Sequence, residues 1–119
     1  MKHLLTFIIK NKNNKVLIHS THRYGLPIAY SDSEKCTLEI LNRIKKRYAL
    51  DNLKIIKKKK LTYLDKNKRK HSKIVIICKT TAQSNIKYVL WANVSAFRTT
   101  SKNKFARGFV QRTVLDSLK

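Results

Sequence analysis

The sequence predicts an α+β fold in a single domain that spans residues 1–119. Hydrophobic residues make up 42% of the chain, which is enough for one core but not for two. Apolar segments of strand length occur in hairpin-like runs, and two segments with helical spacing accompany them. The resulting order, β-β-(β)-α-β-β-β-α, is typical of sheets that pack against helices.

The first elements are a hairpin and a loop. Residues 3–10 are rich in Leu, Phe and Ile, and residues 16–18 form a second short apolar run. Residues 11–14 between them predict a turn, because asparagine tolerates left-handed backbone conformations. Residues 25–27, Gly-Leu-Pro, predict a loop that leads into a short extended segment.

A helix is predicted near residues 33–49. Ser31 followed by Glu34 three residues later fits a capping box, in which each side chain bonds the other residue's backbone amide. Apolar residues then recur at helical spacing from Leu41 to Tyr48, and the opposite side carries lysine and arginine. We therefore expect an amphipathic helix with one basic face.

The second half of the chain predicts three more strands and a final helix. Residues 53–64 mix apolar residues with lysine, and residues 66–70 predict a turn. Residues 72–80 form a β-branched run that indicates a central strand, and residues 88–91 predict a further strand. Phenylalanine and valine recur on one side of a predicted helix near residues 103–118.

The charge balance is the most unusual property of the sequence. Lys and Arg number 28 against 6 Asp and Glu, which gives a formal net charge of +22 at pH 7. Such an excess destabilises a compact fold by self-repulsion and indicates a partner dense in phosphates, with an anionic membrane as the next candidate. Compositional drift toward Lys and Asn explains part of the excess, but not the scarcity of Asp and Glu.

Other function classes have little support in the sequence. The apolar start at residues 4–9 is too short to cross a membrane and lacks a cleavage site. Cys36 and Cys78 are too few for a disulfide framework, and His19 and His22 lack further zinc ligands at a suitable spacing. No phosphate-binding glycine motif occurs. We expect a cytoplasmic protein without a cofactor or a metal site.

The order of the elements and the segment from Leu26 to Leu50 resemble the Nudix family. Its signature is G-x5-E-x7-R-E-U-x-E-E-x-G-U, where U is a bulky apolar residue, and it forms a loop, a helix and a loop. Aligned on the helix, Glu34 falls on the first glutamate, and Ile44 and Leu50 fall on the apolar positions. The resemblance implies a mixed sheet flanked by helices, an α/β/α sandwich.

The sequence departs from this signature where the family's chemistry resides. The family's glutamates share one helix face and bind magnesium, which bridges a diphosphate and helps to activate water. A basic face repels the metal but attracts phosphate, so the resemblance implies a catalytically inactive domain. The departures, in three glutamates, one arginine and two glycines, are at Arg43, Lys46, Arg47, Asn42, Ile28 and Ala49.

Four basic clusters are candidate phosphate-binding sites: the helix face, the lysine run of the strand that follows it, the next turn and the start of the last helix. A solvated helix face, an edge strand protected by lysines or a soluble turn would each give the same pattern. An anion bound at the last cluster would relieve the repulsion between its cations and the helix dipole. The residues are Arg43, Lys46, Arg47, Lys58, Lys60, Lys68, Arg69, Arg98, Lys102, Lys104 and Arg107.

The sequence thus predicts a non-catalytic domain that binds nucleic acid or a nucleotide phosphate. RNA is favoured over duplex DNA because no helix-turn-helix or zinc finger is present, and Tyr24 and Tyr30 are candidates for base stacking. One alternative is a diverged Nudix-type hydrolase that uses Glu34 and Glu39. Another is an interaction subunit of an acidic protein or a ribonucleoprotein particle.

Overall fold

A computed structural model describes the chain in five segments, and within them one helix and a seven-stranded sheet form. The segments are residues 3–20, 24–33, 36–64, 67–81 and 86–93. The elements are β1 (His3–Lys10), β2 (Val16–Ser20), β3 (Tyr24–Gly25), β4 (Ile28–Ser31), α1 (Leu38–Arg47), β5 (Lys54–Leu64), β6 (Lys70–Lys79) and β7 (Val89–Ala92). The α+β class is therefore confirmed, while the predicted helix at 103–118 lies outside the described residues.

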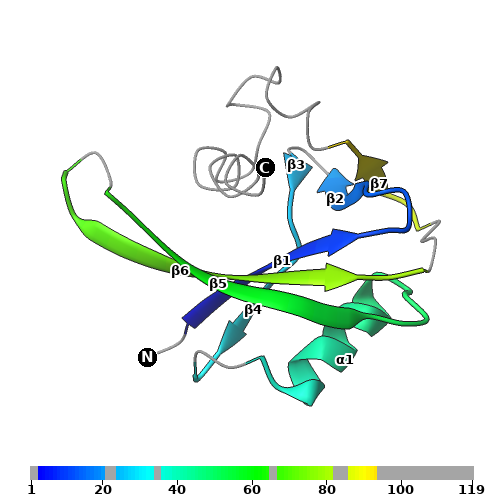
Figure 1. Ribbon diagram of the computed structural model, residues 1–119, viewed down its shortest axis with the longest axis horizontal. Helices are drawn as coiled ribbons and strands as arrows, with labels where there is room; N and C mark the ends of the chain where they lie inside the picture. Colours follow the sequence, from blue (N-terminus) through cyan, green and yellow to red (C-terminus); the bar gives the residue numbers. More distant parts are fainter. Residues whose placement is uncertain (1–2, 21–23, 34–35, 65–66, 82–85, 94–119) are drawn as a thin grey trace.

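The strands form one mixed sheet (Figure 1). Its main path is β3-β2-β1-β6-β5, and in addition β4 pairs with β1 and β7 pairs with β2. β1 runs antiparallel to β2 and β4 but parallel to β6, with Leu5 beside Ile74 and Lys10 beside Lys79. β6 therefore lies between β1 and β5, in the central position that its β-branched run predicts.

The helix packs on one face of β1 and β6. Side chains alternate along a strand, so every second residue of these strands faces α1 and the residues between face away. Burying one such aliphatic or aromatic side chain contributes about 1.5–3 kcal/mol to stability. The buried side chains of this layer therefore hold the helix on the sheet. The core on this face consists of Leu5, Phe7, Ile9, Leu17, Ile40, Ile44, Tyr48, Leu50, Ile74, Ile76 and Cys78.

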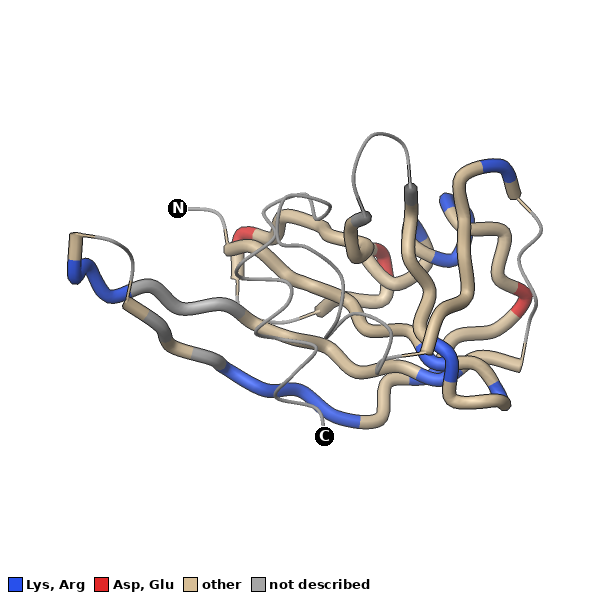
Figure 2. The backbone as a smooth tube through the Cα atoms, turned by 90° about the horizontal axis from the view of Figure 1, so that it is seen from above, with Lys and Arg blue, Asp and Glu red and all other residues tan. Residues whose placement is uncertain are grey.

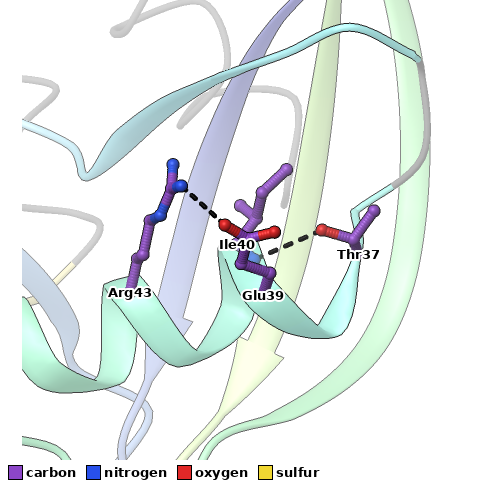
Figure 3. A network of polar contacts seen from close by, with 4 residues as sticks. All are labelled: Thr37, Glu39, Ile40 and Arg43. Atoms are coloured by element: carbon purple, nitrogen blue, oxygen red, sulfur yellow. Dashed lines mark hydrogen bonds and ion pairs between the residues drawn. The ribbon is translucent and has the colours of Figure 1, made fainter.

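The helix begins later than the sequence predicts. Its N-cap is Thr37, whose Oγ1 accepts a hydrogen bond from the Ile40 amide at 3.3 Å (Figure 3). The predicted cap, Ser31, instead ends β4, where it pairs with His3 of β1. The capping-box prediction is therefore wrong, because pairing with β1 holds this segment extended. Glu34, the other half of the box, lies outside the described residues.

The helix ends in a Schellman motif. The amide of Leu50 donates to the carbonyl of Lys45 at 2.9 Å, and the amide of Ala49 donates to the carbonyl of Lys46 at 3.3 Å. Ala49 adopts a left-handed conformation with φ of 51°, which glycine takes without strain. The left-handed turn at Ala49 therefore ends the helix with a backbone conformation that glycine adopts more readily than alanine.

The turn at residues 11–14 forms as predicted. Asn14 is left-handed with φ of 59°, and Oδ1 of Asn11 accepts hydrogen bonds from the amides of Asn13 and Lys15 at 2.9 and 3.0 Å. Lys10 then pairs with Val16, so the first two strands form an antiparallel hairpin. Across the described segments, no helix combines the length and apolar character that crossing a membrane requires.

Candidate functional site

Three exposed basic residues of α1 are those that the resemblance to the Nudix signature aligns with glutamates. Arg43, Lys46 and Arg47 are exposed, whereas Ile40 and Ile44 of the same helix are buried. The three basic side chains are spaced at i, i+3 and i+4, so they share one helix face. The helix face that the sequence predicts is therefore present, and we use the term for these three residues.

Arg43 has an ion-pair partner on the same helix. Its Nη2 lies 2.7 Å from Oε1 of Glu39, and the side chains are 70% and 74% exposed (Figure 3). Exposed pairs of this i, i+4 kind contribute only about 0.3–0.5 kcal/mol, so a phosphate can displace the carboxylate at small cost.

The helix face does not fit the magnesium ion that the resemblance to the Nudix family implies. Its three side chains are cations, and hard divalent metals take oxygen ligands. Within the described segments, no group of three His, Cys, Asp or Glu side chains gathers in a way that could hold a metal ion. No catalytic step through a metal is therefore assigned to these residues.

The basic residues near the end of α1 also stabilise the helix. Lys45, Lys46 and Arg47 occupy its last turn, where cations interact favourably with the negative end of the helix dipole by roughly 0.3–1 kcal/mol each. The guanidinium of Arg47 also lies 5.5 Å from the centre of the Tyr48 ring, within cation–π range. Part of the positive charge therefore has a structural role.

Arg47 also acts on His19 of β2. Burial lowers the pKa of His19 below its usual 6.5, and the nearby Arg47 charge lowers it further, against a hydrogen bond to the Leu26 carbonyl. Nε2 of His19 donates that bond at 3.3 Å. A Cβ at Gly25 would collide with the imidazole ring of His19, so glycine lets the ring take this position without a shift. The sequence suggested His19 only as an unsupported zinc ligand, and His22 lies outside the described residues.

The lysine run lies on the edge strand β5 and divides between the two faces of the sheet. Lys58 pairs with Ile76 and Lys60 with Ile74, so both lie on the face that α1 covers. Lys57 and Lys59 alternate with them and belong to the opposite face. The edge position agrees with the alternative explanation that lysines protect an edge strand from pairing with another chain.

The hairpin tip between β5 and β6 forms a separate basic stretch. Lys68 and Arg69 are exposed there, and Lys68 is left-handed with φ of 61°. Figure 2 shows this tip and the lysine run of β5 as distinct stretches along one long hairpin. Residues 61–64 of β5, which carry no charge, separate the lysine run from the tip along the chain.

The remaining predicted site residues divide between described and undescribed segments. Tyr30, in β4, is 52% exposed and therefore accessible for stacking. Tyr24 forms part of β3, but its side chain lies outside the described part of the structure. The cluster at the start of the predicted last helix also lies outside it, and comprises Arg98, Lys102, Lys104 and Arg107.

The sequence did not reveal a row of lysines across three neighbouring strands. Lys10 of β1 pairs with Lys79 of β6, and Lys79 pairs with Lys54 of β5. Each of these lysines lies within one residue of the end of a predicted strand. This position was the only sequence pattern that could have indicated the row. Their alignment depends on the parallel register of β1 and β6, which local sequence patterns do not specify.

Comparison with known proteins identifies the fold. No protein-family model matches the sequence, and no curated protein sequence matches it significantly. Among solved structures, the Nudix hydrolase RenU from M. smegmatis has a TM-score of 0.61 at 11% identity, covering 98% of this chain and 82% of that one. The MutT protein from Bacillus halodurans has a TM-score of 0.56 at 12% identity, covering 98% and 80%.

A third similar structure belongs to a longer protein. It is assigned as an oxidoreductase from Sinorhizobium meliloti 1021 and has a TM-score of 0.64 at 15% identity. The match covers 98% of this chain but only 40% of that protein. Similarity at such low identity shows the fold and not the activity. The mixed sheet, its helix and these neighbours together give this chain a Nudix-like α+β fold.

Proposed function

We propose that this chain is a non-catalytic Nudix-like domain that binds nucleic acid through its basic surfaces, with RNA as the preferred ligand. The observation that carries the proposal is the helix face. Arg43, Lys46 and Arg47 are exposed and share one face of α1, and the resemblance to the Nudix signature aligns them with glutamates. Because basic residues repel a metal ion and attract an anion, this reversal of charge favours phosphate binding over metal binding.

The chemistry of these side chains suits a phosphate backbone. Arginine offers paired donors to two phosphate oxygens, and lysine supplies a compact positive charge beside them. Because α1 is anchored by Ile40 and Ile44, the cations on its outer face start from an ordered backbone. They lose less conformational entropy on binding than cations on the hairpin tip.

The experiment compares two triple variants in a titration with a labelled single-stranded RNA, followed by fluorescence anisotropy at physiological salt. One variant carries Arg43→Gln, Lys46→Gln and Arg47→Gln. The matched control carries Lys68→Gln, Arg69→Gln and Lys70→Gln, with the same change of charge. Glutamine is preferable to glutamate because a carboxylate in the last turn would oppose the helix dipole.

The helix variant should lose more than about tenfold in affinity, because it removes charge-assisted hydrogen bonds. The tip variant should lose about threefold or less, because its charges act mainly at long range and are screened. Circular dichroism verifies that both variants remain folded. An equal loss in both variants would show that the charge acts as a diffuse coat and would remove the helix face from the proposal.

A second assay separates this function from a diverged hydrolase. With magnesium and nucleoside diphosphate-linked compounds as substrates, we expect no formation of nucleoside monophosphate above background. Turnover that disappears in a Glu34→Gln variant would instead establish the hydrolase.

A further inference from the structure

A pocket of about 360 Å³ opens at the edge of the sheet where β1 and β6 end and β5 begins. Its volume lies within the range of small-molecule sites. None of its lining residues belongs to the helix face or the hairpin tip. The lining consists of Asn11, Lys12, Asn14, Asn52, Lys54, Lys79, Thr80 and Thr81.

The pocket concentrates positive charge. Lys54 and Lys79 are directly opposite one another on adjacent strands, and Lys10 adjoins Lys79 on the other side. Residues opposite each other in an antiparallel pair have Cβ atoms only about 4.5–5.5 Å apart, and like charges there destabilise the sheet. Lys12 adds another cation from the turn, and the described residues of the lining include no carboxylate. The cost of this arrangement is relieved when an anion binds.

A network of hydrogen bonds connects several of the residues that line the pocket. Nδ2 of Asn52 donates to Oγ1 of Thr81 at 2.7 Å, and Oδ1 of Asn52 accepts from the Thr81 amide at 3.0 Å. Oγ1 of Thr80 donates to the carbonyl of Asn52 at 2.7 Å, and the Thr80 amide donates to the carbonyl of Lys10 at 2.9 Å. Asn11 and Thr80 are buried, so the cations project from a frame that is already ordered.

We propose that this pocket binds a phosphate group, held by the ammonium groups of Lys12, Lys54 and Lys79. Three cations match the charge of a phosphate better than that of a single carboxylate. The lining has no aromatic side chain, so nothing in it would stack on a base, and recognition is limited to the phosphate. The inference deepens the proposed function and rests on it where the phosphate belongs to a nucleic-acid backbone. The same chemistry also accommodates a free phosphorylated compound.

The test uses inorganic pyrophosphate as the probe, titrated into the full chain by isothermal titration calorimetry. The variant Lys54→Gln with Lys79→Gln should lose at least about tenfold in affinity. Its melting temperature should rise, because the variant removes directly opposed like charges. The matched control, Lys57→Gln with Lys59→Gln, changes the same charge on the same face of β5 and should lose about twofold or less.

Lys12→Gln provides a second variant, because it lies in an exposed turn where a substitution leaves the sheet intact. It should also weaken pyrophosphate binding without lowering the melting temperature. Equal affinity of all variants and the parent, or no binding of pyrophosphate by the parent chain, would overturn the inference.

A parallel titration with single-stranded RNA identifies the source of the phosphate. If the Lys54→Gln, Lys79→Gln variant loses RNA affinity and pyrophosphate competes with RNA, the pocket holds a backbone phosphate. If pyrophosphate binds but RNA does not, the pocket stands as a site for a free phosphorylated compound and the proposed function fails. If RNA affinity is unchanged and pyrophosphate does not bind, the proposed function stands and the pocket carries no phosphate.

Discussion

The left-handed backbone of Ala49 stores strain that a glycine would remove. This conformation costs an L-residue about 1–2 kcal/mol, and the greater flexibility of glycine in the unfolded chain offsets part of the gain. We therefore expect Ala49→Gly to stabilise the protein by roughly 0.5–1 kcal/mol and to raise the melting temperature by roughly 2–5 °C. Differential scanning calorimetry measures this shift. Ala49→Val is the matched control and should melt at a lower temperature than the parent. If the glycine variant also melted at a lower temperature, the backbone of Ala49 would not be strained.

His19 makes stability depend on pH. Burial and Arg47 lower its pKa in the folded protein, so the unfolded chain binds a proton more readily than the native one. The contribution of His19 is therefore fully present above pH 6.5, the ordinary pKa, and is lost as the pH falls through the lower folded pKa. Melting temperatures between pH 7.5 and pH 5 should fall less in His19→Gln than in the parent. Parallel curves for the two proteins would contradict this.

At the scale of the element, the start of α1 depends on the hydrogen bond that Oγ1 of Thr37 accepts from the Ile40 amide. Thr37→Ala removes the acceptor for the Ile40 amide and should destabilise the protein by about 1 kcal/mol. Thr37→Ser keeps the hydroxyl and should lie within a few tenths of a kcal/mol of the parent. Urea unfolding followed by circular dichroism compares the variants. If the alanine variant were as stable as the serine variant, Thr37 would not cap the helix.

Local sequence patterns predicted most of the elements. The β-branched run that forms β6 and the turn at Asn11 to Asn14 depend on neighbouring residues alone, and both formed where expected. The predicted start of α1 was wrong because Ser31 pairs with His3, which lies twenty-eight positions away along the chain. Long-range pairing of this kind overrides a local capping signal.

The row of Lys10, Lys79 and Lys54, which contributes two lysines to the pocket, could not be predicted for the same reason. Lys10, Lys54 and Lys79 meet only because β1 and β6 run parallel and β5 pairs antiparallel beside them. The helix face was predictable because residues spaced at i, i+3 and i+4 on one helix meet without any tertiary information. The cations on one helix could therefore be predicted from the sequence, whereas the cations that lie together on three neighbouring strands could not.

At the scale of the whole molecule, the net charge of +22 should give salt opposite effects on stability and binding. Raising sodium chloride from low concentration to about 0.5 M screens self-repulsion and should raise the melting temperature. The same change should weaken RNA binding, with the logarithm of affinity falling linearly with the logarithm of salt concentration. Chloride is used because sulfate also strengthens apolar burial. RNA affinity that does not respond to salt would contradict a phosphate interface.

The hairpin of β5 and β6 has a further consequence for how the protein opens. β1 pairs with β6 only from Ile74 to Lys79, whereas β5 and β6 remain paired as far as Leu64 and Lys70 (Figure 1). Among the described strands, the outer part of this hairpin is thus a two-stranded ribbon, which is marginally stable alone. Its backbone amides should exchange with deuterium faster than those of Ile74 to Cys78, which exchange only when the sheet itself opens. The basic tip of the hairpin can then change shape against a partner while the core of the domain stays closed.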